Sequence, residues 1–238
     1  MSTPKPRATP GPAGPGAPGS REKSARERMI DVAEELIAEY GVEAVSLRTV
    51  GAQAGQRNNS AAQYHFGSKE GLIHAIIAVR SPGVDARRQE LVSEYRRSGA
   101  DDIESLVRLL VLPLAETIDR SGERTWYLRF LANVMDHPMW HEVGEPAEGE
   151  QPALRYMARE LRKRLPHLSG RTLRRRSRWM AIIAFRVLAD HERELAAATR
   201  RNRAPSTNQV VEELVDTLVA LLRSEERGTQ GRQQGSDG

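Results

Sequence analysis

Apolar side chains recur along this chain at spacings of three and four residues, which is the period of an amphipathic α-helix. The first such segment begins at Ser24, where Glu27 completes the signature of a capping box, and it ends at Gly41. The sequence contains neither an internal repeat nor a convincing alternation of apolar and polar residues that would indicate a β-strand. The pattern therefore predicts an all-α fold.

The same pattern marks the later helices. One helix is expected to begin at Ser68, and Pro82 should kink or end it because the residue before a proline disfavours the helical conformation. Helical patterning then resumes up to Gly99, and Asp101 with Glu104 should open the next helix. The remaining helices are expected over the ranges 126–137, 154–165, 173–198 and 206–222, the last of which opens with a second capping box.

Residues 46–72 have the organisation of a helix-turn-helix. A short apolar-stepped stretch that contains Leu47 and Val50 runs into Gly55, and a polar turn separates it from a second stretch that closes on Phe66. In a helix-turn-helix, the second helix lies in the major groove of DNA while neighbouring residues hold the backbone. The segment therefore predicts DNA as the ligand.

Composition limits the other classes of function. The net charge of +4 permits an anionic partner without demanding one. The absence of cysteine excludes disulfides, thiolate metal sites and cysteine catalysis. The Pro/Gly-rich residues 1–20 and the tail 227–238 are expected to be disordered. No signal peptide and no membrane-spanning stretch is evident, so we expect a cytoplasmic protein.

The joint pattern of these motifs resembles the DNA-binding domain of the TetR family of bacterial transcriptional regulators. The resemblance covers about residues 24–77, and the motifs that carry it are Tyr40-Gly41, Ser46-Leu47-Arg48-Thr49-Val50, Ala54-Gly55 and the run from Tyr64 to Leu72. The rest of the chain matches the family in the number and length of its helices. The turn from Gln56 to Asn59 is one residue longer than is usual in the family, and we expect this protein's own specificity to lie there.

The resemblance implies an N-terminal three-helix helix-turn-helix domain over 21–70 and a C-terminal helical effector-binding and dimerisation domain over 71–226. It further implies a ligand-responsive repressor that binds a palindromic or pseudopalindromic operator as a homodimer and is released by a small apolar or aromatic effector. Two alternatives remain. The chain could be a DNA-binding regulator without a small-molecule effector, or an all-α interaction domain whose helix-turn-helix is vestigial.

The polar side chains of the helix-turn-helix divide into two groups of expected DNA contacts. Asn58 is expected to cap the recognition helix. Side chains near the start of that helix and on the preceding one should face base edges, with Gln63 suited to adenine and Arg48 to guanine; these are Arg48, Asn59, Ser60 and Gln63. Phosphate contacts are expected from Ser46, Thr49, Tyr64, His65 and Lys69. Alternatively, Arg48 could pair with a glutamate of the first helix, and Gln63 could be merely solvated.

The C-terminal half offers a dimer interface and a possible pocket. The apolar stripes of the last two helices predict a four-helix interface between two copies, with an intrachain hairpin as the alternative; the residues are Ile183, Val187, Val211, Leu214, Val215, Leu218 and Leu222. Aromatic and methionine side chains of the middle helices predict an apolar effector pocket, with ordinary core as the alternative; they are Trp126, Phe130, Met135, Trp140, Tyr156, Trp179 and Met180.

The remaining motifs of the sequence are weaker indications of function. The arginines at 174–176 and 178 could form a nucleic-acid patch, but a solvated helix face beside the acidic segment 142–150 is the favoured interpretation. His137 and His141 stand four residues apart, yet Pro138 lies between them and no third ligand is evident, so no metal is expected. No catalytic motif appears, which predicts neither an enzyme nor a cofactor. The basic residues 21–28 are hypothesised to reach the minor groove.

Overall fold

The computed structural model describes residues 23–58, 60–99, 102–119, 125–137, 152–198 and 204–226. Every regular element within these ranges is a helix, which confirms the predicted all-α fold. The helices are α1 (Ala25–Tyr40), α2 (Leu47–Gln53), α3 (Ala61–Phe66), α4 (Lys69–Ser98), α5 (Ile103–Asp119), α6 (Tyr127–Met135), α8 (Pro152–Arg164), α9 (Gly170–Ala197) and α10 (Thr207–Arg223). The tails predicted to be disordered lie outside the described residues.

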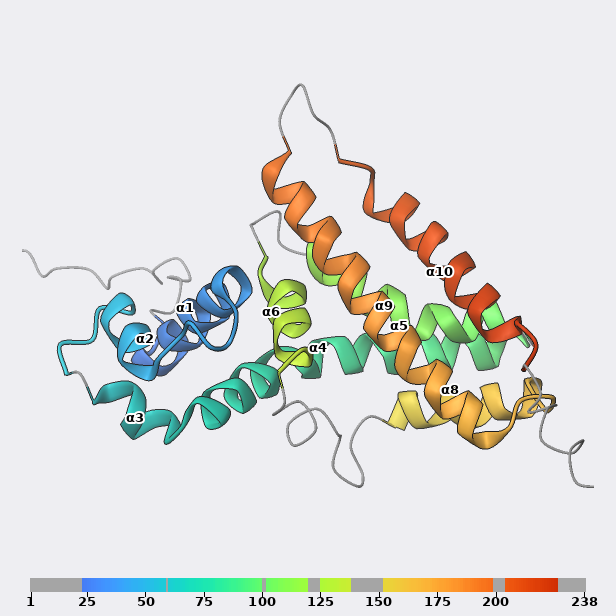
Figure 1. Cartoon of the computed structure of the whole chain (residues 1–238), viewed down its shortest axis with the longest axis horizontal. Coiled ribbons are helices and arrows are strands. Elements are labelled where there is room, and N and C mark those ends of the chain that lie inside the picture. The colour runs from blue at the N-terminus through green and yellow to red at the C-terminus, as the bar shows by residue number, and fades with distance from the viewer. Residues whose placement is uncertain are drawn as a thin grey trace, which may run out of the picture.

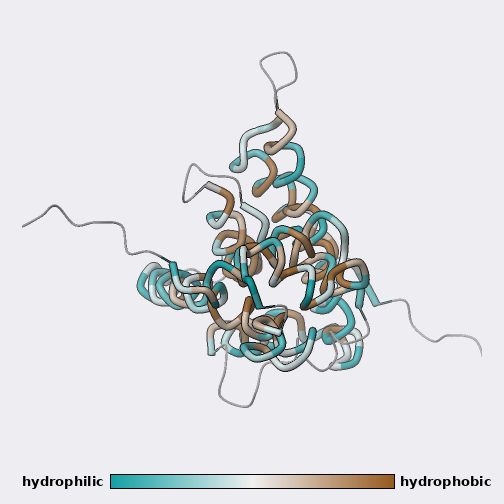
Figure 2. The backbone as a smooth tube through the Cα atoms, turned by 90° about the vertical axis from the view of Figure 1, so that its left-hand side faces the viewer, coloured by the Kyte–Doolittle hydropathy of each residue, from teal (hydrophilic) through white to brown (hydrophobic). Residues whose placement is uncertain are grey.

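The helices form two connected parts. The short helices α1, α2 and α3 form a cluster at one end of the long axis, and α4 leads from it into a larger bundle of α5, α6, α8, α9 and α10 (Figure 1). In the bundle, α9 and α10 lie side by side and run in opposite directions. Figure 2 shows hydrophobic and hydrophilic segments along the same helices, as expected of amphipathic helices that bury one face.

The predicted caps fix the ends of several helices. Ser24 Oγ accepts a hydrogen bond from the backbone N–H of Glu27, whose carboxylate accepts one from the backbone N–H of Ser24, so this capping box is confirmed. Ser206 and Gln209 form the second box in the same way. At the other end of α1, Gly41 has φ of +81°, a conformation that L side chains rarely adopt. The first helix therefore ends where its sequence predicts.

Pro82 does not end α4, which was one of its two expected effects. The helix runs without a break from Lys69 to Ser98 with Pro82 inside it. Proline in a helix costs about 3 kcal/mol. The ring of Pro82 lies on the exposed side, and Ile76 and Val84 are buried on either side of it. Burial of these flanking turns stabilises the continuous helix more than the proline destabilises it.

The apolar stripe of α10 packs within its own chain. The five residues predicted there as interface have exposed fractions of 4% or less; they are Val211, Leu214, Val215, Leu218 and Leu222. They face α5 and α9. Within the chain, α10 therefore packs as the intrachain hairpin that was the alternative, and its place in a dimer interface stays a prediction. The reason is that α5 needs an apolar cover, which the sequence of α10 alone does not reveal.

The two α9 residues predicted at the dimer interface, Ile183 and Val187, are not fully buried within the chain. Val187 is 37% exposed and Ile183 is half-buried, while Trp179 and Ile182 are 42% and 41% exposed. These four residues follow one another at spacings of one, three and four residues, so they form one stripe of the helix. We call Trp179, Ile182, Ile183 and Val187 the α9 apolar stripe.

Arg176 departs from the solvated face that was predicted for the arginine run. Its guanidinium is buried and donates hydrogen bonds to the carbonyl oxygens of Leu222, at 3.0 Å, of Glu225, at 3.1 Å, and of Ser224. These carbonyls lie at and just beyond the carboxyl end of α10, where helix carbonyls have no partner within the helix. Arg176 therefore caps α10. The other three arginines of the run are exposed, in keeping with the prediction, and the acidic segment 142–150 lies outside the described residues.

Candidate nucleic-acid interface

The recognition helix α3 rests on α2 through small side chains. Ala62 and Phe66 are buried, and a Cβ placed on Gly51 of α2 would lie 3.8 Å from the Cβ of Ala62. This close approach leaves the opposite face of α3 in solvent, with Gln63 and Tyr64 exposed. Tyr64 is 88% exposed, so both its ring and its hydroxyl group are accessible from solvent. The outer face of α3 is therefore polar and open.

The turn before α3 differs from the prediction at Asn58. The helix begins at Ala61 and its N-cap residue is Ser60. The side chain of Asn58 accepts a hydrogen bond from the backbone N–H of Ser60 at 2.9 Å, and its carbonyl accepts one from Ala61 at 3.0 Å. Asn58 therefore stabilises the turn rather than capping the helix, because it lies two residues before the N-cap residue Ser60. Asn59 lies outside the described residues.

The other residues predicted to read bases lie at the surface. No carboxylate pairs with Arg48 in the part of the chain that the structure describes, so the predicted alternative of an ion pair with α1 is not seen. Ser60 is exposed at the start of α3. Gln63 donates a side-chain hydrogen bond to the carbonyl oxygen of Gly67 on the same surface. Ser60 and Gln63 are therefore accessible from solvent, and Gln63 has this one side-chain hydrogen bond.

Three of the predicted phosphate contacts surround α2 and α3. Ser46 caps α2 by accepting from the backbone N–H of Thr49 at 3.1 Å, and the two hydroxyl groups lie 2.8 Å apart. His65 is exposed and lies edge-on to Tyr64, with ring centroids 5.5 Å apart. Each of these groups has capacity for a further hydrogen bond to a phosphate oxygen.

Lys69 is held more firmly than its sequence indicates. Its ammonium donates to the carbonyl oxygen of Val42 at 2.9 Å and lies 3.9 Å from a carboxylate oxygen of Glu43. The side chain is only 27% exposed. An ammonium has three donors, so Lys69 fastens the turn between α1 and α2 and retains capacity for a phosphate.

Helix α6 of the larger bundle and His137 just after it contact the end of α1 and the same turn. The side-chain amide of Asn133 donates to the carbonyl oxygens of Ile37, at 2.8 Å, and Ala38, at 3.1 Å, in the last turns of α1. His137 lies 2.7 Å from the carboxylate of Glu43. The hydrogen bond with His137, followed by the charge of Lys69, lowers the pKa of Glu43. The sequence pattern assigned His137 no role beyond a helix boundary, and only the folded chain brings it to Glu43.

A buried ion pair joins α1 to α4. Glu34 is 4% exposed, and its carboxylate accepts a hydrogen bond from Arg80 Nε at 2.7 Å. Arg80 also donates to Asp31 at 2.8 Å. Burial raises the pKa of Glu34, and the guanidinium opposes that shift. The acidic residues of the first helix are thus partly structural, because they fix the angle at which α4 leaves the helix-turn-helix.

The residues predicted to line an effector pocket are dispersed. Phe130 and Met180 are fully buried, whereas Trp179 is exposed on α9. Trp126 is half-buried beneath the guanidinium of Arg129, which lies 4.2 Å from its ring centroid. Met135 and Tyr156 are also half-buried, and Trp140 lies outside the described residues. The prediction that these side chains contact an effector remains open.

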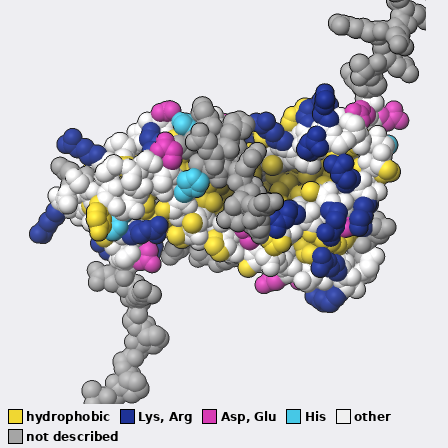
Figure 3. All heavy atoms as spheres, turned by 90° about the horizontal axis from the view of Figure 1, so that it is seen from below, with side chains coloured by type: hydrophobic (Ala, Val, Ile, Leu, Met, Phe, Trp, Pro, Cys, Tyr) yellow, Lys and Arg dark blue, Asp and Glu magenta, His cyan; other side chains and the backbone are white. Residues whose placement is uncertain are grey.

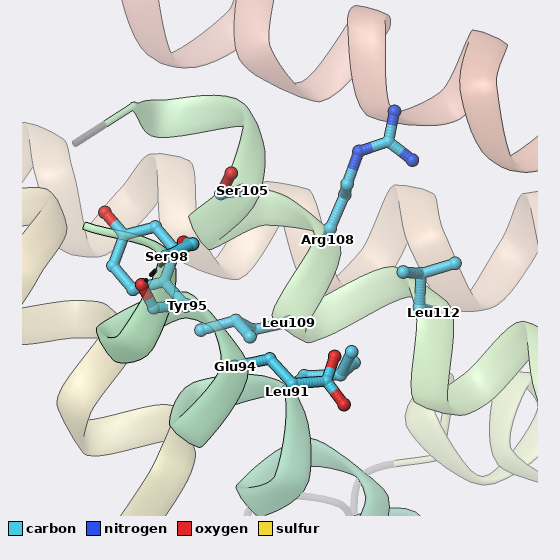
Figure 4. Close-up of a pocket in the computed structure, with 8 residues that line it drawn as sticks. All are labelled: Leu91, Glu94, Tyr95, Ser98, Ser105, Arg108, Leu109 and Leu112. Atoms are coloured by element: carbon cyan, nitrogen blue, oxygen red, sulfur yellow. Dashed lines mark hydrogen bonds between the residues drawn. The ribbon is translucent and has the colours of Figure 1, made fainter. Parts of the chain in front are cut away.

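A cavity of about 230 Å³ lies between α4 and α5 (Figure 4). It is lined by Leu91, Glu94, Tyr95, Ser98, Ser105, Arg108, Leu109 and Leu112, none of which belongs to the predicted set. The guanidinium of Arg108 points away from the cavity towards α10, where it donates a hydrogen bond to Glu212 at 2.8 Å. The ring of Tyr95 contacts that of Tyr156, with ring centroids 6.4 Å apart. Tyr156, which was predicted to line the effector pocket, therefore lies next to a residue that lines this cavity.

Metal-binding clusters and membrane-spanning helices do not occur in the described ranges. These ranges include no group of three or more His, Asp or Glu side chains that could hold a metal ion. None of the described helices combines the length and apolarity that a bilayer-spanning helix requires.

Comparisons with known proteins place both parts of the chain. Residues 29–76 match the model of the bacterial regulatory proteins of the tetR family, and residues 108–220 match the model of the tetracyclin repressor-like C-terminal domain. No curated protein matches the sequence. Among solved structures, Mycobacterium smegmatis AmtR is similar at 18% identity and a TM-score of 0.45, over 89% of this chain and 92% of that one. The TetR family regulator PfmR from Thermus thermophilus is similar at 19% identity and a TM-score of 0.41, over 87% and 100% of the two chains.

Proposed function

Since the chain belongs to the TetR family of bacterial regulatory proteins, we propose that this DNA-binding transcriptional regulator is a cytoplasmic repressor of a palindromic operator. The observation that carries the proposal is the open polar face of α3, which is backed by Ala62 and Phe66 and exposes Gln63 and Tyr64. A helix presented in this way fits the major groove.

The two expected groups of DNA contacts follow from this orientation. Arg48, Ser60 and Gln63, with Asn59 in the same turn, read base edges. Ser46, Thr49, Tyr64, His65 and Lys69 bind phosphates and set the register. Contacts of the second kind carry affinity without sequence information, so the two groups are separable by experiment.

Gln63→Ala tests the base-reading proposal. Loss of a bidentate contact to adenine, worth about 1–3 kcal/mol, should weaken operator binding about 5-fold to 150-fold. Gln89→Ala is the matched control, because Gln89 is exposed on α4 outside the helix-turn-helix. The measurement is DNase protection of the DNA upstream of the protein's own gene, titrated with each variant. Absence of any protected inverted repeat at low salt would refute the regulator itself.

A dimer through the α9 apolar stripe is part of the proposal. Trp179, Ile182 and Val187 are 42%, 41% and 37% exposed on one stripe of a helix in the larger bundle, away from the helix-turn-helix. Contact between two copies of the stripe would remove this surface from water and yield a two-fold dimer. Its two recognition helices would need to lie about 34–36 Å apart to read adjacent half-sites.

Ile182→Asp tests this interface. An unpaired carboxylate in the contact should cost at least about 3 kcal/mol and weaken dimerisation by about 100-fold or more. Val79→Asp is the control, since Val79 is 46% exposed on α4 and lies off the stripe. Sedimentation equilibrium measures both variants. Dimerisation of Ile182→Asp as tight as that of Val79→Asp would place the interface elsewhere.

The cavity between α4 and α5 is the proposed effector site. Its leucines, Leu91, Leu109 and Leu112, suit a small apolar or aromatic molecule. An effector acts only if it binds one conformer better than another, by about 10⁴-fold for a complete switch. Because α4 joins this cavity to Glu34 of α1 through Arg80, it connects effector binding to the angle of the helix-turn-helix.

A further inference from the structure

A strongly basic surface lies at the opposite end of the molecule from α3. Figure 3 shows Lys and Arg side chains gathered on the half of this face that lies away from α1–α3. Six arginines at the surface form two stripes, one on α8 and one at the start of α9. We call them the distal basic face: Arg155, Arg159, Arg162, Arg171, Arg174 and Arg178.

Four of the six arginines of this face, Arg162, Arg171, Arg174 and Arg178, have no carboxylate partner among the described residues. The nearly buried carboxylate of Glu160 already pairs with Arg159, Lys163 and Arg164. Surface guanidinium groups without a carboxylate leave a positive potential that favours an anion.

Two of these guanidinium groups converge. Arg162 Nη1 of α8 and Arg174 Nη1 of α9 lie 3.1 Å and 3.6 Å from the position that a Cβ on Gly170 would occupy. Like charges held this close repel each other, and an anion placed between them removes the repulsion. Gly170 leaves room above the first turn of α9 for both side chains. The pair therefore has the form of a clamp for a phosphate group.

Aromatic rings hold neighbouring arginines in place. Arg96 and Arg159 lie 4.5 Å and 5.3 Å from the ring centroid of Tyr156, and Arg175 lies 5.3 Å from that of Trp179. Such contacts orient the guanidinium heads and reduce the entropy lost when they bind a ligand. They also occupy ring surface that unpaired bases would otherwise stack on. This arrangement favours a ligand that presents its backbone, namely a duplex.

We propose that the distal basic face binds the phosphate backbone of double-stranded DNA without sequence preference, in addition to the contact that the helix-turn-helix makes. The forked donors of arginine match phosphate oxygens. The stripe from Arg155 to Arg162 extends about 10 Å along α8, a length over which duplex DNA carries about six charges. Because the face and α3 lie at opposite ends of the long axis, the two surfaces engage different segments of DNA.

The test uses the full chain with its helix-turn-helix disabled at both kinds of contact, by Arg48→Ala and Gln63→Ala for the bases and Tyr64→Ala and Lys69→Ala for the phosphates. Binding to a fluorescent duplex of random sequence is titrated between low and moderate salt. Adding Arg162→Ala, Arg171→Ala and Arg174→Ala should remove three phosphate contacts, so the slope of log K against log salt should become shallower by about 2.7. Arg193→Ala is the matched control, since Arg193 is exposed on α9 beyond this face and should leave the slope unchanged.

The possible outcomes separate this proposal from others. Equal affinity and equal slope for the disabled protein and its triple-arginine variant would overturn it. Tighter binding to phosphatidylglycerol vesicles than to the duplex would also overturn it, by assigning the face to a membrane surface. Thermal unfolding of each variant confirms that it is folded. Operator protection by the wild-type protein tests the repressor proposal independently, so failure of one proposal is distinguishable from failure of the other.

Discussion

Replacing Glu192 with alanine should lower the free energy of unfolding by about 3–5 kcal/mol. Glu192 is 2% exposed, and one carboxylate oxygen accepts from both Arg129 N and Arg129 Nε at 3.1 Å. The other oxygen accepts from the hydroxyl of Thr125 at 2.7 Å. Without the carboxylate, the guanidinium of Arg129 stays buried with an uncompensated charge. The loss is therefore much larger than that of a surface ion pair.

Urea unfolding of three variants tests this prediction. Glu194→Ala is the matched control, because Glu194 is exposed two residues further along α9 and should change stability by no more than about 0.5 kcal/mol. The double variant Glu192→Leu with Arg129→Met removes both charges and should recover most of the stability. A double variant no more stable than Glu192→Ala would show that packing, rather than the unpaired charge, causes the loss.

Phe130→Ala should cost about 3–5 kcal/mol of unfolding free energy, because it leaves a cavity in a close-packed interior. Phe130 is fully buried and stacks with Tyr127 at a centroid distance of 6.3 Å. The sequence pattern predicted Phe130 in an effector pocket. A side chain that lines an open pocket would lose less on truncation, since its contacts with the protein are fewer.

The measurement is again urea unfolding, with Tyr40→Ala as the control. Tyr40 is an aromatic residue that is 64% exposed at the end of α1, so its truncation should cost under about 1 kcal/mol. Similar small losses for both variants would indicate that Phe130 faces a space that the protein leaves unfilled. A large loss for Phe130 alone assigns this residue to the core.

The sequence predicted best those features that depend on neighbours along the chain. The capping boxes at Ser24 and Ser206 use side chains three residues apart, so they form as soon as the helix does. Ser60 and Gln63, which the helix-turn-helix pattern directed towards DNA, are exposed beside the buried Phe66. Periodicity also predicted the apolar stripe of α10.

The sequence could not reveal which distant helix of the chain packs against a given helix face. The α10 stripe is equally consistent with a partner chain or with α5, and only the folded chain decides for α5. Asn133 reaches carbonyl oxygens of α1 from a helix that is remote in the sequence, and Arg176 likewise caps a different helix. Polar residues of this kind have no local signature, because a solvent-exposed amide or guanidinium produces the same pattern.

The length of α4 determines how far a small rotation of this helix would move the recognition helix on DNA. A straight helix of 30 residues is about 45 Å long. A rotation of about 5° about its far end would displace its first turn by about 4 Å, which is close to the step of about 3.4 Å between successive base pairs. Helix α4 is continuous through Pro82, so a single helix connects the cavity to its own first turn beside α3. A tilt of this size would move the recognition helix by about one base-pair step along the DNA.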